Sequence, residues 1–112
     1  MAELRLKTHL QVGAAVRLGS TLAIPVTVAR KGEPDSGSVA IKLVQARDRV
    51  SVLVQFRDMD GKLHWMRATG PEPKAEAECD AYLEKAIRRD PDLWVVEIED
   101  RDGRHLFDGV VK

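Results

Sequence analysis

The densest group of polar side chains that could do chemistry lies near the end of the chain. It consists of carboxylates and one imidazole, namely Glu97, Glu99, Asp100, Asp102 and His105. Sets rich in oxygen suit hard divalent cations, which take several carboxylate and carbonyl ligands. The Asp-x-Asp-Gly run that starts at Asp100 is only a fragment of a calcium-binding loop, which needs a longer ordered series. These residues are therefore weak candidate metal ligands, and a solvated strand edge with an ordinary turn is the favoured explanation.

The rest of the chain lacks the spacings that zinc binding or nucleophilic catalysis uses. The three histidines, His9, His64 and His105, are scattered and form no zinc motif with the one cysteine, Cys79. Cys79 lies on the apolar stripe of a predicted helix, where a buried and unreactive thiol is the usual state. His64 is expected at an exposed or rim position beside Trp65. We predict no catalytic residue and no cofactor, and we favour a non-enzymatic protein while leaving an enzyme open.

Basic residues recur on the predicted strands between residues 30 and 67. With Phe56 and Trp65 as stacking platforms they could form a nucleic-acid-binding face: Lys31, Lys42, Arg47, Arg49, Arg57 and Lys62. The whole chain is neutral, however, with Lys+Arg 18, Asp+Glu 18 and a sequence pI near 6.8. Dedicated nucleic-acid-binding proteins are usually basic. We therefore rank nucleic-acid binding below protein binding.

Two aromatic and two basic side chains are further candidates for interaction. Trp65 and Trp94 are the only tryptophans, and both fall in predicted strands, where the core or its rim is expected. If either is exposed, it is a natural interface anchor, because tryptophan is enriched at binding hot spots. Arg101 and Arg104 flank the carboxylates of the last turn and could act with them on a ligand.

The elements that must position these residues belong to one domain. A chain of 112 residues that is 44% hydrophobic and 32% charged fits a single soluble domain, 1–112, with one core. One cysteine cannot form an internal disulfide, so a reducing compartment is expected. No apolar run approaches the roughly 20 residues of a membrane span, and residues 1–7 lack the apolar run of a signal peptide. We expect a cytoplasmic protein without membrane contact.

Hydrophobic patterning predicts mainly strands in the first part of the chain. Alternation from Leu4 to Val12 predicts a half-buried strand that Gly13 ends, and a short weak helix is predicted over 14–21. Pro25 places the next strand, 24–30, at a sheet edge or delays its start. Further strands are predicted at 38–45, 50–57 and 62–68, with a loop at 31–37 and a hairpin turn at 58–61. In that turn Asp60-Gly61 supplies the positive-φ pair.

One strong helix is predicted in the second part of the chain. Pro73 suits its first turn, and Asp90-Pro91 ends it. Its apolar stripe recurs at helical spacing: Ala75, Cys79, Tyr82, Leu83, Ala86 and Ile87. A strand over 93–99, a turn over 100–103 and a short final strand over 104–107 follow. The result is an α+β domain with a mainly antiparallel sheet of five or six strands and two helices, the N-terminal one short and weak.

Two segments resemble a known family. The run from Arg30 to Val39 and the run from Asp90 to Arg101 are similar to a family of short alphaproteobacterial proteins. That family is catalogued as a domain of unknown function, number fourteen ninety-one. The resemblance spans most of the chain, with the C-terminal segment more specific and residues 44–70 less so. It implies a small cytoplasmic bacterial protein and brings no established activity, so no catalytic residue can be carried over.

These observations favour a small non-enzymatic domain that acts by binding a protein partner or a second copy of itself. An open sheet edge could serve such pairing. The first alternative is a metal-binding or small-ligand-binding protein, or an enzyme, that uses the carboxylates of residues 97–108 with Arg101 or Arg104. The second alternative is a nucleic-acid-associated protein that uses the basic strands between residues 30 and 67.

Overall fold

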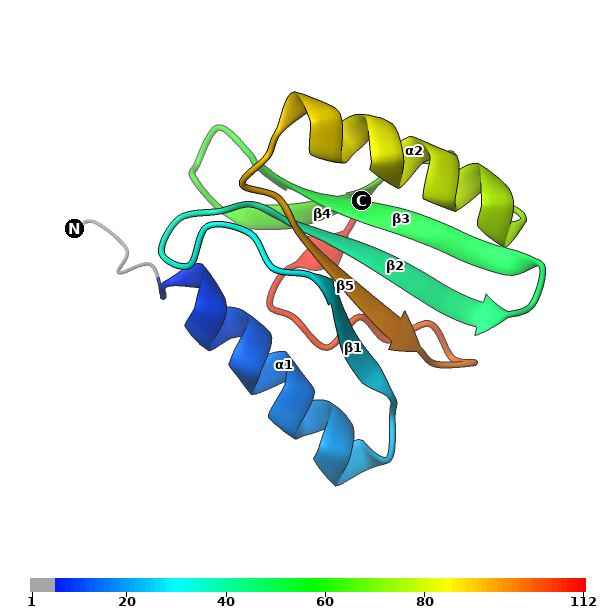
Figure 1. Cartoon of the computed structure of the whole chain (residues 1–112). Helices are drawn as coiled ribbons and strands as arrows, with labels where there is room; N and C mark the ends of the chain where they lie inside the picture. Colours follow the sequence, from blue (N-terminus) through cyan, green and yellow to red (C-terminus); the bar gives the residue numbers. More distant parts are fainter. Residues whose placement is uncertain (1–5) are drawn as a thin grey trace.

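The computed structural model describes residues 6–112, in which a sheet of six strands forms the middle layer (Figure 1). The strand order across the sheet is β1-β5-β2-β3-β4-β6. The predicted α+β fold is confirmed. The elements are α1 (Thr8–Leu22), β1 (Val26–Arg30), β2 (Val39–Ala46), β3 (Arg49–Arg57), β4 (Leu63–Arg67), α2 (Glu76–Arg89), β5 (Trp94–Glu99) and β6 (Val110–Val111).

The sheet is mixed, which refines the prediction of a mainly antiparallel one. The β2–β3, β3–β4 and β1–β5 pairs are antiparallel, whereas β2–β5 and β4–β6 are parallel. The predicted hairpins of neighbouring strands hold from β2 to β4. The chain then crosses through α2 and returns beside β2, because a parallel neighbour needs a long crossover rather than a tight turn. β5 is therefore an interior strand of the sheet, between β1 and β2.

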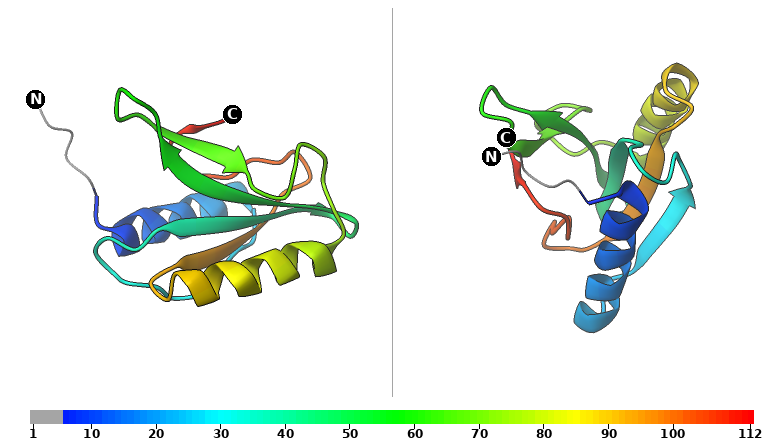
Figure 2. Two further views of the ribbon diagram at one scale, coloured as in Figure 1. Left: turned by 90° about the horizontal axis from the view of Figure 1, so that it is seen from above. Right: turned by 90° about the vertical axis from the view of Figure 1, so that its left-hand side faces the viewer.

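The two helices cover opposite faces of the sheet (Figure 2). On one face Val12 of α1 packs with Ile41 and other strand residues, and on the other Cys79 and Leu83 of α2 pack with Val52. The predicted apolar stripe of α2 is confirmed at these two buried positions. Its start differs from the prediction, because α2 begins at Glu76 and Pro73 lies outside it. In the described residues, no helix is long and apolar enough to cross a bilayer.

The predicted strand from Leu4 to Val12 is wrong. Residues 1–5 lie outside the described part, and the chain is helical from Thr8 onward. The buried positions of α1 include Thr8, Val12 and Ala15, which follow helical spacing. Leu10 belongs to the same period-2 pattern but is exposed, so the apparent alternation does not reflect burial. Gly13 lies inside the helix and ends no element.

Gly19, which weakens the sequence-based prediction of this helix, allows α1 to approach β1 closely. A Cβ atom at this position would lie 2.5 Å from Val26 Cγ2 and 2.6 Å from the Ile24 carbonyl oxygen. Glycine lowers helix propensity, but here it removes a steric conflict that no other side chain avoids. Pro25 stands just before β1, which begins at Val26 on the sheet edge, as predicted.

The C-terminal segment also differs from the prediction. Residues 104–107 form no strand, and the last strand is β6, which pairs with β4 in parallel. Leu106 and Phe107 instead pack against the core on the face of the sheet that α1 covers, which we call the α1-side core. The turn at 100–103 is confirmed, with Gly103 at φ 75°. In the hairpin turn before β4 only Gly61 has positive φ, at 80°, so the predicted positive-φ pair is half right.

Candidate functional site

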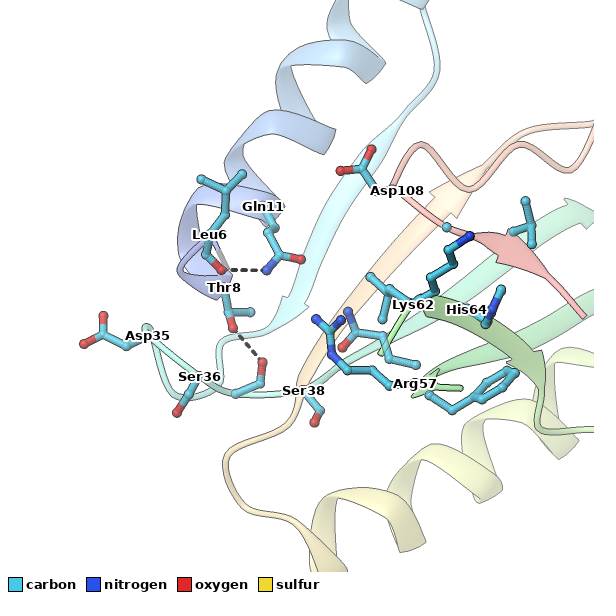
Figure 3. A pocket seen from close by; sticks show the side chains of 16 residues that line it. Leu6, Thr8, Gln11, Asp35, Ser36, Ser38, Arg57, Lys62, His64 and Asp108 are labelled. Carbon is cyan, nitrogen blue, oxygen red and sulfur yellow. Dashed lines mark hydrogen bonds between the residues drawn. The ribbon is translucent and has the colours of Figure 1, made fainter. Parts of the chain in front are cut away.

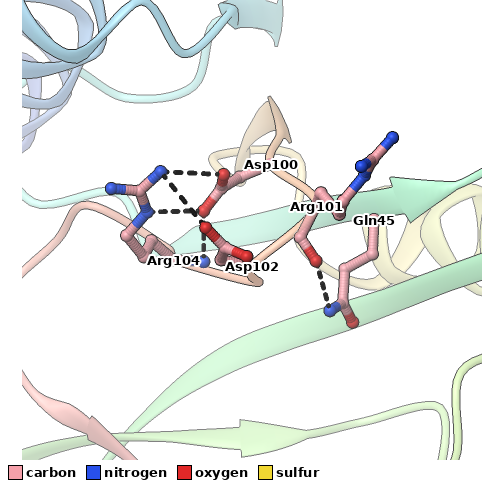
Figure 4. Close-up of polar contacts among 5 residues, drawn as sticks. All are labelled: Gln45, Asp100, Arg101, Asp102 and Arg104. Carbon is pink, nitrogen blue, oxygen red and sulfur yellow. Dashed lines mark hydrogen bonds and ion pairs between the residues drawn. The ribbon is translucent and has the colours of Figure 1, made fainter.

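The turn that contains Asp100 is closed by its own ion pair (Figure 4). The Asp100 side chain is only 7% exposed. Its Oδ2 accepts from the backbone N–H and the Nε of Arg104, both at 2.8 Å, and its Oδ1 accepts from Arg104 Nη2 at 3.1 Å. These bonds lower the pKa of Asp100 from 3.8 to about 2. The carboxylate that starts the Asp-x-Asp-Gly run is thus engaged within its own turn.

The other candidate metal ligands lie on different sides of the sheet. Glu97 faces α2 and lies 3.4 Å from Lys42 Nζ, whereas Glu99 is exposed at the end of β5. His105 packs on Trp65 with the ring centroids 5.6 Å apart, and burial lowers the pKa of its imidazole. Among residues 6–112, no three His, Cys, Asp or Glu side chains gather as a metal site. Arg101 is exposed and contributes its carbonyl oxygen to Gln45 Nε2 at 3.2 Å.

The Asp100 ion pair predicts a specific response to acid. A carboxylate whose pKa is lowered on folding stabilises the protein above its unfolded pKa and loses that contribution as the pH falls through its folded pKa. We expect wild-type stability to fall between about pH 4 and pH 2, and Asp100→Asn to show a smaller acid loss. At neutral pH the variant should lose about 1–2 kcal/mol, since Arg104 is half exposed and its charge is screened. Thermal unfolding followed by circular dichroism at each pH measures both effects.

Asp102→Asn is the matched control, because its side chain is 77% exposed and lies 3.8 Å from Arg104. It should leave the acid profile unchanged. If it alters the profile as strongly as Asp100→Asn does, the assignment of the acid transition to Asp100 is wrong.

Lys42 is a buried cation, which corrects the prediction of a continuous basic sheet face. Its side chain is 9% exposed and reaches Glu76 at 2.7 Å, Asp80 at 2.8 Å and Glu97 at 3.4 Å. Burial lowers the pKa of Lys42, but hydrogen bonds to Asp80 and Glu76 outweigh that effect and raise the pKa above its usual 10.5. Lys42 therefore stays charged and ties α2 to the centre of the sheet.

The other basic residues of the proposed nucleic-acid face are also separated. Arg47 and Arg49 lie at the turn between β2 and β3, whereas Arg57 and Lys62 border the hairpin at the opposite end of β3. Lys31 lies in the loop after β1. The fold thus brings Arg57 and Lys62 together and leaves the other cations elsewhere.

Both tryptophans are buried, so neither is an exposed anchor. Each indole N–H instead donates to the carbonyl of a loop: Trp65 Nε1 to Asp108 at 2.7 Å and Trp94 Nε1 to Glu33 at 2.7 Å. Tryptophan commonly finds such a partner when buried. The two side chains therefore fasten the loop before β2 and the C-terminal segment to the sheet.

Between these two fastened segments lies an open groove of about 850 Å³ (Figure 3). Four parts of the chain border it: the start of α1, residues 35–38, the β3–β4 hairpin and residues 108–110. We call it the α1–hairpin groove. Side chains of mixed character line it, among them Gln11, Ser36, Arg57, Lys62 and Asp108. Sequence reasoning missed this groove, because it assigned the start of α1 to a strand.

The hairpin wall of the groove is held rigidly by Asp58. Its Oδ1 accepts from the backbone N–H of Asp60 at 2.9 Å and of Lys62 at 3.0 Å, and its Oδ2 lies 2.7 Å from His64 Nε2. The bond to His64 is the main cause that lowers the pKa of Asp58. Arg57 Nη1 donates to the Gly61 carbonyl at 2.7 Å. These bonds thus order the turn from which the Arg57 and Lys62 side chains project.

His64 is buried, which corrects the prediction of an exposed or rim position. Its ring packs beside Phe56 with centroids 5.4 Å apart. Nδ1 has no hydrogen-bond partner among residues 6–112. A nucleophile–base pair needs hydrogen-bond contact between the two groups. Cys79 is no such partner, because its Sγ is buried against the Val50 carbonyl at 3.4 Å and burial raises the pKa of its thiol.

The first turn of α1 uses its amide groups within the protein. The backbone N–H of Thr8 donates to the Asp35 carbonyl at 3.1 Å, and that of His9 to the Pro34 carbonyl at 2.9 Å. The Thr8 hydroxyl donates to the Gly37 carbonyl at 2.7 Å. These bonds fix the helix to the loop before β2, so the N–H groups of Thr8 and His9 are already used within the protein.

The comparisons with known proteins agree with this fold. A family model described as "Protein of unknown function (DUF1491)" matches residues 6–108. The chain belongs to the DUF1491 family. A crystal structure of a DUF1491 protein from Caulobacter crescentus shares 39% identity at a TM-score of 0.88, and covers 96% of this chain and 100% of its own. An NMR structure of a DUF1491 protein from the same bacterium shares 39% identity at 0.85, with coverage of 98% and 99%.

A further relative shows the same fold at lower identity. The solution structure of a protein from A. tumefaciens matches at 24% identity and a TM-score of 0.79, covering 97% of this chain and 98% of its own. A search of the curated proteins found no match. The resemblance noted from the sequence is thus confirmed. Membership in DUF1491 assigns no activity, so a function must be argued from the groove and the surface beside it.

Proposed function

We propose that this DUF1491 protein is a non-enzymatic module that binds a segment of a partner protein along α1 and beside the α1–hairpin groove. One observation carries the proposal: Leu10, Leu18 and Leu22 of α1 are each 42–46% exposed. We call these three residues the leucine stripe. Single exposed leucines are common, whereas exposed apolar side chains grouped on one surface mark an interaction site.

Leu18 and Leu22 of the leucine stripe continue the line of the groove. Gln11 lines the groove, and Leu18 and Leu22 follow it roughly two and three turns later on the same side of α1. Leu6, which precedes the helix, also lines the groove and is 59% exposed. Apolar side chains and a mixed polar hollow therefore share one surface, as in modules that receive an amphipathic partner segment.

The surface suits another protein better than a second copy of this chain. The α1 sequence contains Arg17 and no Asp or Glu, so two α1 helices would offer each other no charge of opposite sign. The alternative of self-pairing through β1 is also disfavoured. Pro25 precedes this five-residue edge strand, and its register shifts between Val28 and Arg30. A proline and an irregularity of this kind protect a sheet edge from pairing.

The remaining features agree with a binding role inside the cell. The Asp58–His64 pair has no nucleophile bonded to it among the described residues, which favours binding over covalent catalysis. The only cysteine is a free, buried thiol, as suits a reducing compartment such as the cytoplasm.

Site-specific photocrosslinking tests this proposal. A photoreactive amino acid replaces Leu18 on the proposed surface or Lys85 on the exposed face of α2, and each protein is irradiated in a lysate of its own source. We expect a product of defined mass from position 18, competed by unlabelled wild-type protein and lost in Leu22→Glu. Identical products from both positions, or a product that is only a dimer of this chain, would contradict the proposal.

A further inference from the structure

The hairpin wall of the α1–hairpin groove carries two cations without an acidic partner. Among residues 6–112, neither Arg57 nor Lys62 lies within ion-pair distance of a carboxylate. Both side chains reach into the gap between the hairpin and α1 (Figure 3). This differs from Lys42 and Arg104, whose charges are compensated by carboxylates of the chain itself.

The turn that carries these two cations is ordered, and the Arg57 side chain is held as well. Asp58 fixes the turn through two backbone amides and through His64, and the Gly61 carbonyl holds the Arg57 guanidinium at 2.7 Å. The hairpin turn is therefore already ordered before a ligand binds, which reduces the conformational entropy lost on binding. An arginine and a lysine on such a turn favour anionic groups, arginine through its planar set of donors.

The other charges at the groove lie on different walls. Asp35 stands at the rim, points away from the cations and pairs with Lys7 at 3.9 Å. Asp108 belongs to the C-terminal segment, and its backbone carbonyl accepts a hydrogen bond from the Trp65 indole. The hairpin also contains Asp58 and Asp60, but these two carboxylates do not line the groove. Arg57 and Lys62 are therefore the ionic side chains that the hairpin turns toward the groove, and α1 opposite adds no carboxylate.

We infer that the partner segment is acidic and amphipathic, with carboxylates placed at Arg57 and Lys62 and apolar side chains placed on the leucine stripe. This inference rests on the proposed function and specifies the chemistry of its partner. Opposite charges at the edge of an interface select the partner and raise the association rate, while buried apolar contacts supply most of the affinity.

The apolar neighbourhood favours a peptide over a nucleic acid. Leu6 and Val110 line the groove and are exposed, at 59% and 60%, and the leucine stripe adjoins them. Sites for single-stranded nucleic acid combine cations with exposed aromatic platforms for stacking. Phe56 is the one aromatic side chain besides His64 at this groove, and His64 packs against it. An acidic protein segment fits both the charge and the leucines.

Fluorescence anisotropy with labelled synthetic peptides tests the inference. The probe has leucines at helical spacing and glutamates on the opposite side; comparison peptides carry lysine or glutamine in place of glutamate, and a labelled oligonucleotide is a further probe. We expect the glutamate peptide to bind and the lysine peptide not to bind. Arg57→Gln with Lys62→Gln should raise the Kd of the glutamate peptide about tenfold, and added salt should weaken its binding.

Arg47→Gln with Arg49→Gln is the matched control, since it removes two exposed cations from the opposite end of β3. It should leave the Kd of the glutamate peptide within about twofold, well under a tenfold step of 1.4 kcal/mol. Equal binding of the lysine peptide, an equal loss in the control, preference for the oligonucleotide or no binding of the glutamate peptide overturns the inference. If the glutamine peptide binds as well as the glutamate peptide and Leu18→Glu abolishes both, the charge preference fails while the proposed function stands.

Discussion

Replacing Trp65 with alanine is expected to lower the free energy of unfolding by about 4 kcal/mol, as for other large core side chains. Trp65 is fully buried in the α1-side core, where it packs against His105 and Phe107. Its indole N–H donates to the Asp108 carbonyl at 2.7 Å, and its own carbonyl accepts from the Lys112 N–H at 2.8 Å. The alanine variant therefore loses a core side chain and the indole bond to Asp108, and keeps only the backbone bond to Lys112. Urea unfolding followed by circular dichroism measures the change.

Trp65→Phe separates these two contributions. Phenylalanine keeps the ring in the core but cannot donate to Asp108, so we expect a cost of about 1–3 kcal/mol, part of it from unsatisfied polar groups. Residues 108–110 of the variant should then exchange their amide hydrogens faster than in the wild type, whereas the exchange of β3 should change less. A phenylalanine variant with unchanged exchange in this segment would show that the indole bond does not hold the groove wall.

Removing the charge of Lys42 is the second large effect that we expect. Lys42→Met keeps most of the side-chain volume but leaves Glu76, Asp80 and Glu97 close together without their cation. Breaking a buried ion pair costs about 3–5 kcal/mol, and we expect the lower end because the carboxylates are 29–55% exposed. Lys85→Met, on the exposed face of α2, should cost less than about 0.5 kcal/mol in the same urea titration.

The pH dependence distinguishes this charge effect from simple packing. A lysine whose pKa is raised on folding stabilises the protein below its unfolded pKa, and this contribution is lost as the pH rises through the folded pKa. The usual value is 10.5 and the folded pKa lies above it, so wild type should lose stability above about pH 10.5 relative to Lys42→Met. Parallel alkaline profiles for the two proteins would show that Lys42 acts by packing rather than by charge.

The two tryptophans link the stability of the fold to the proposed binding surface. Trp65 and Trp94 attach the two loops that border the α1–hairpin groove, and Gly19 allows α1 to lie close against β1. A rigid scaffold with a partly exposed helix is the arrangement expected of a module that binds with little rearrangement. Destabilising either attachment should therefore weaken binding without any change in the residues that contact the partner.

Local patterns predicted those parts of the fold in which neighbours in sequence are neighbours in space. The apolar stripe of α2, the consecutive strands β2 to β4 and their turns follow from periodicity and from turn residues such as Gly61 and Gly103. The burial of Cys79 followed from its place on the α2 stripe. The family resemblance followed from two short runs of sequence.

The sequence by itself determined the fold class, the second helix and the position of most strands along the chain, because periodicity and turn chemistry act over a few residues. Only the tertiary structure decided that Thr8–Val12 is helical, that β5 enters the sheet between β1 and β2, and that Lys42 is enclosed by three carboxylates. Each of these depends on burial by segments distant in the chain, and burial overrides local propensity. The α1–hairpin groove, which four separate segments border, could be found in no other way.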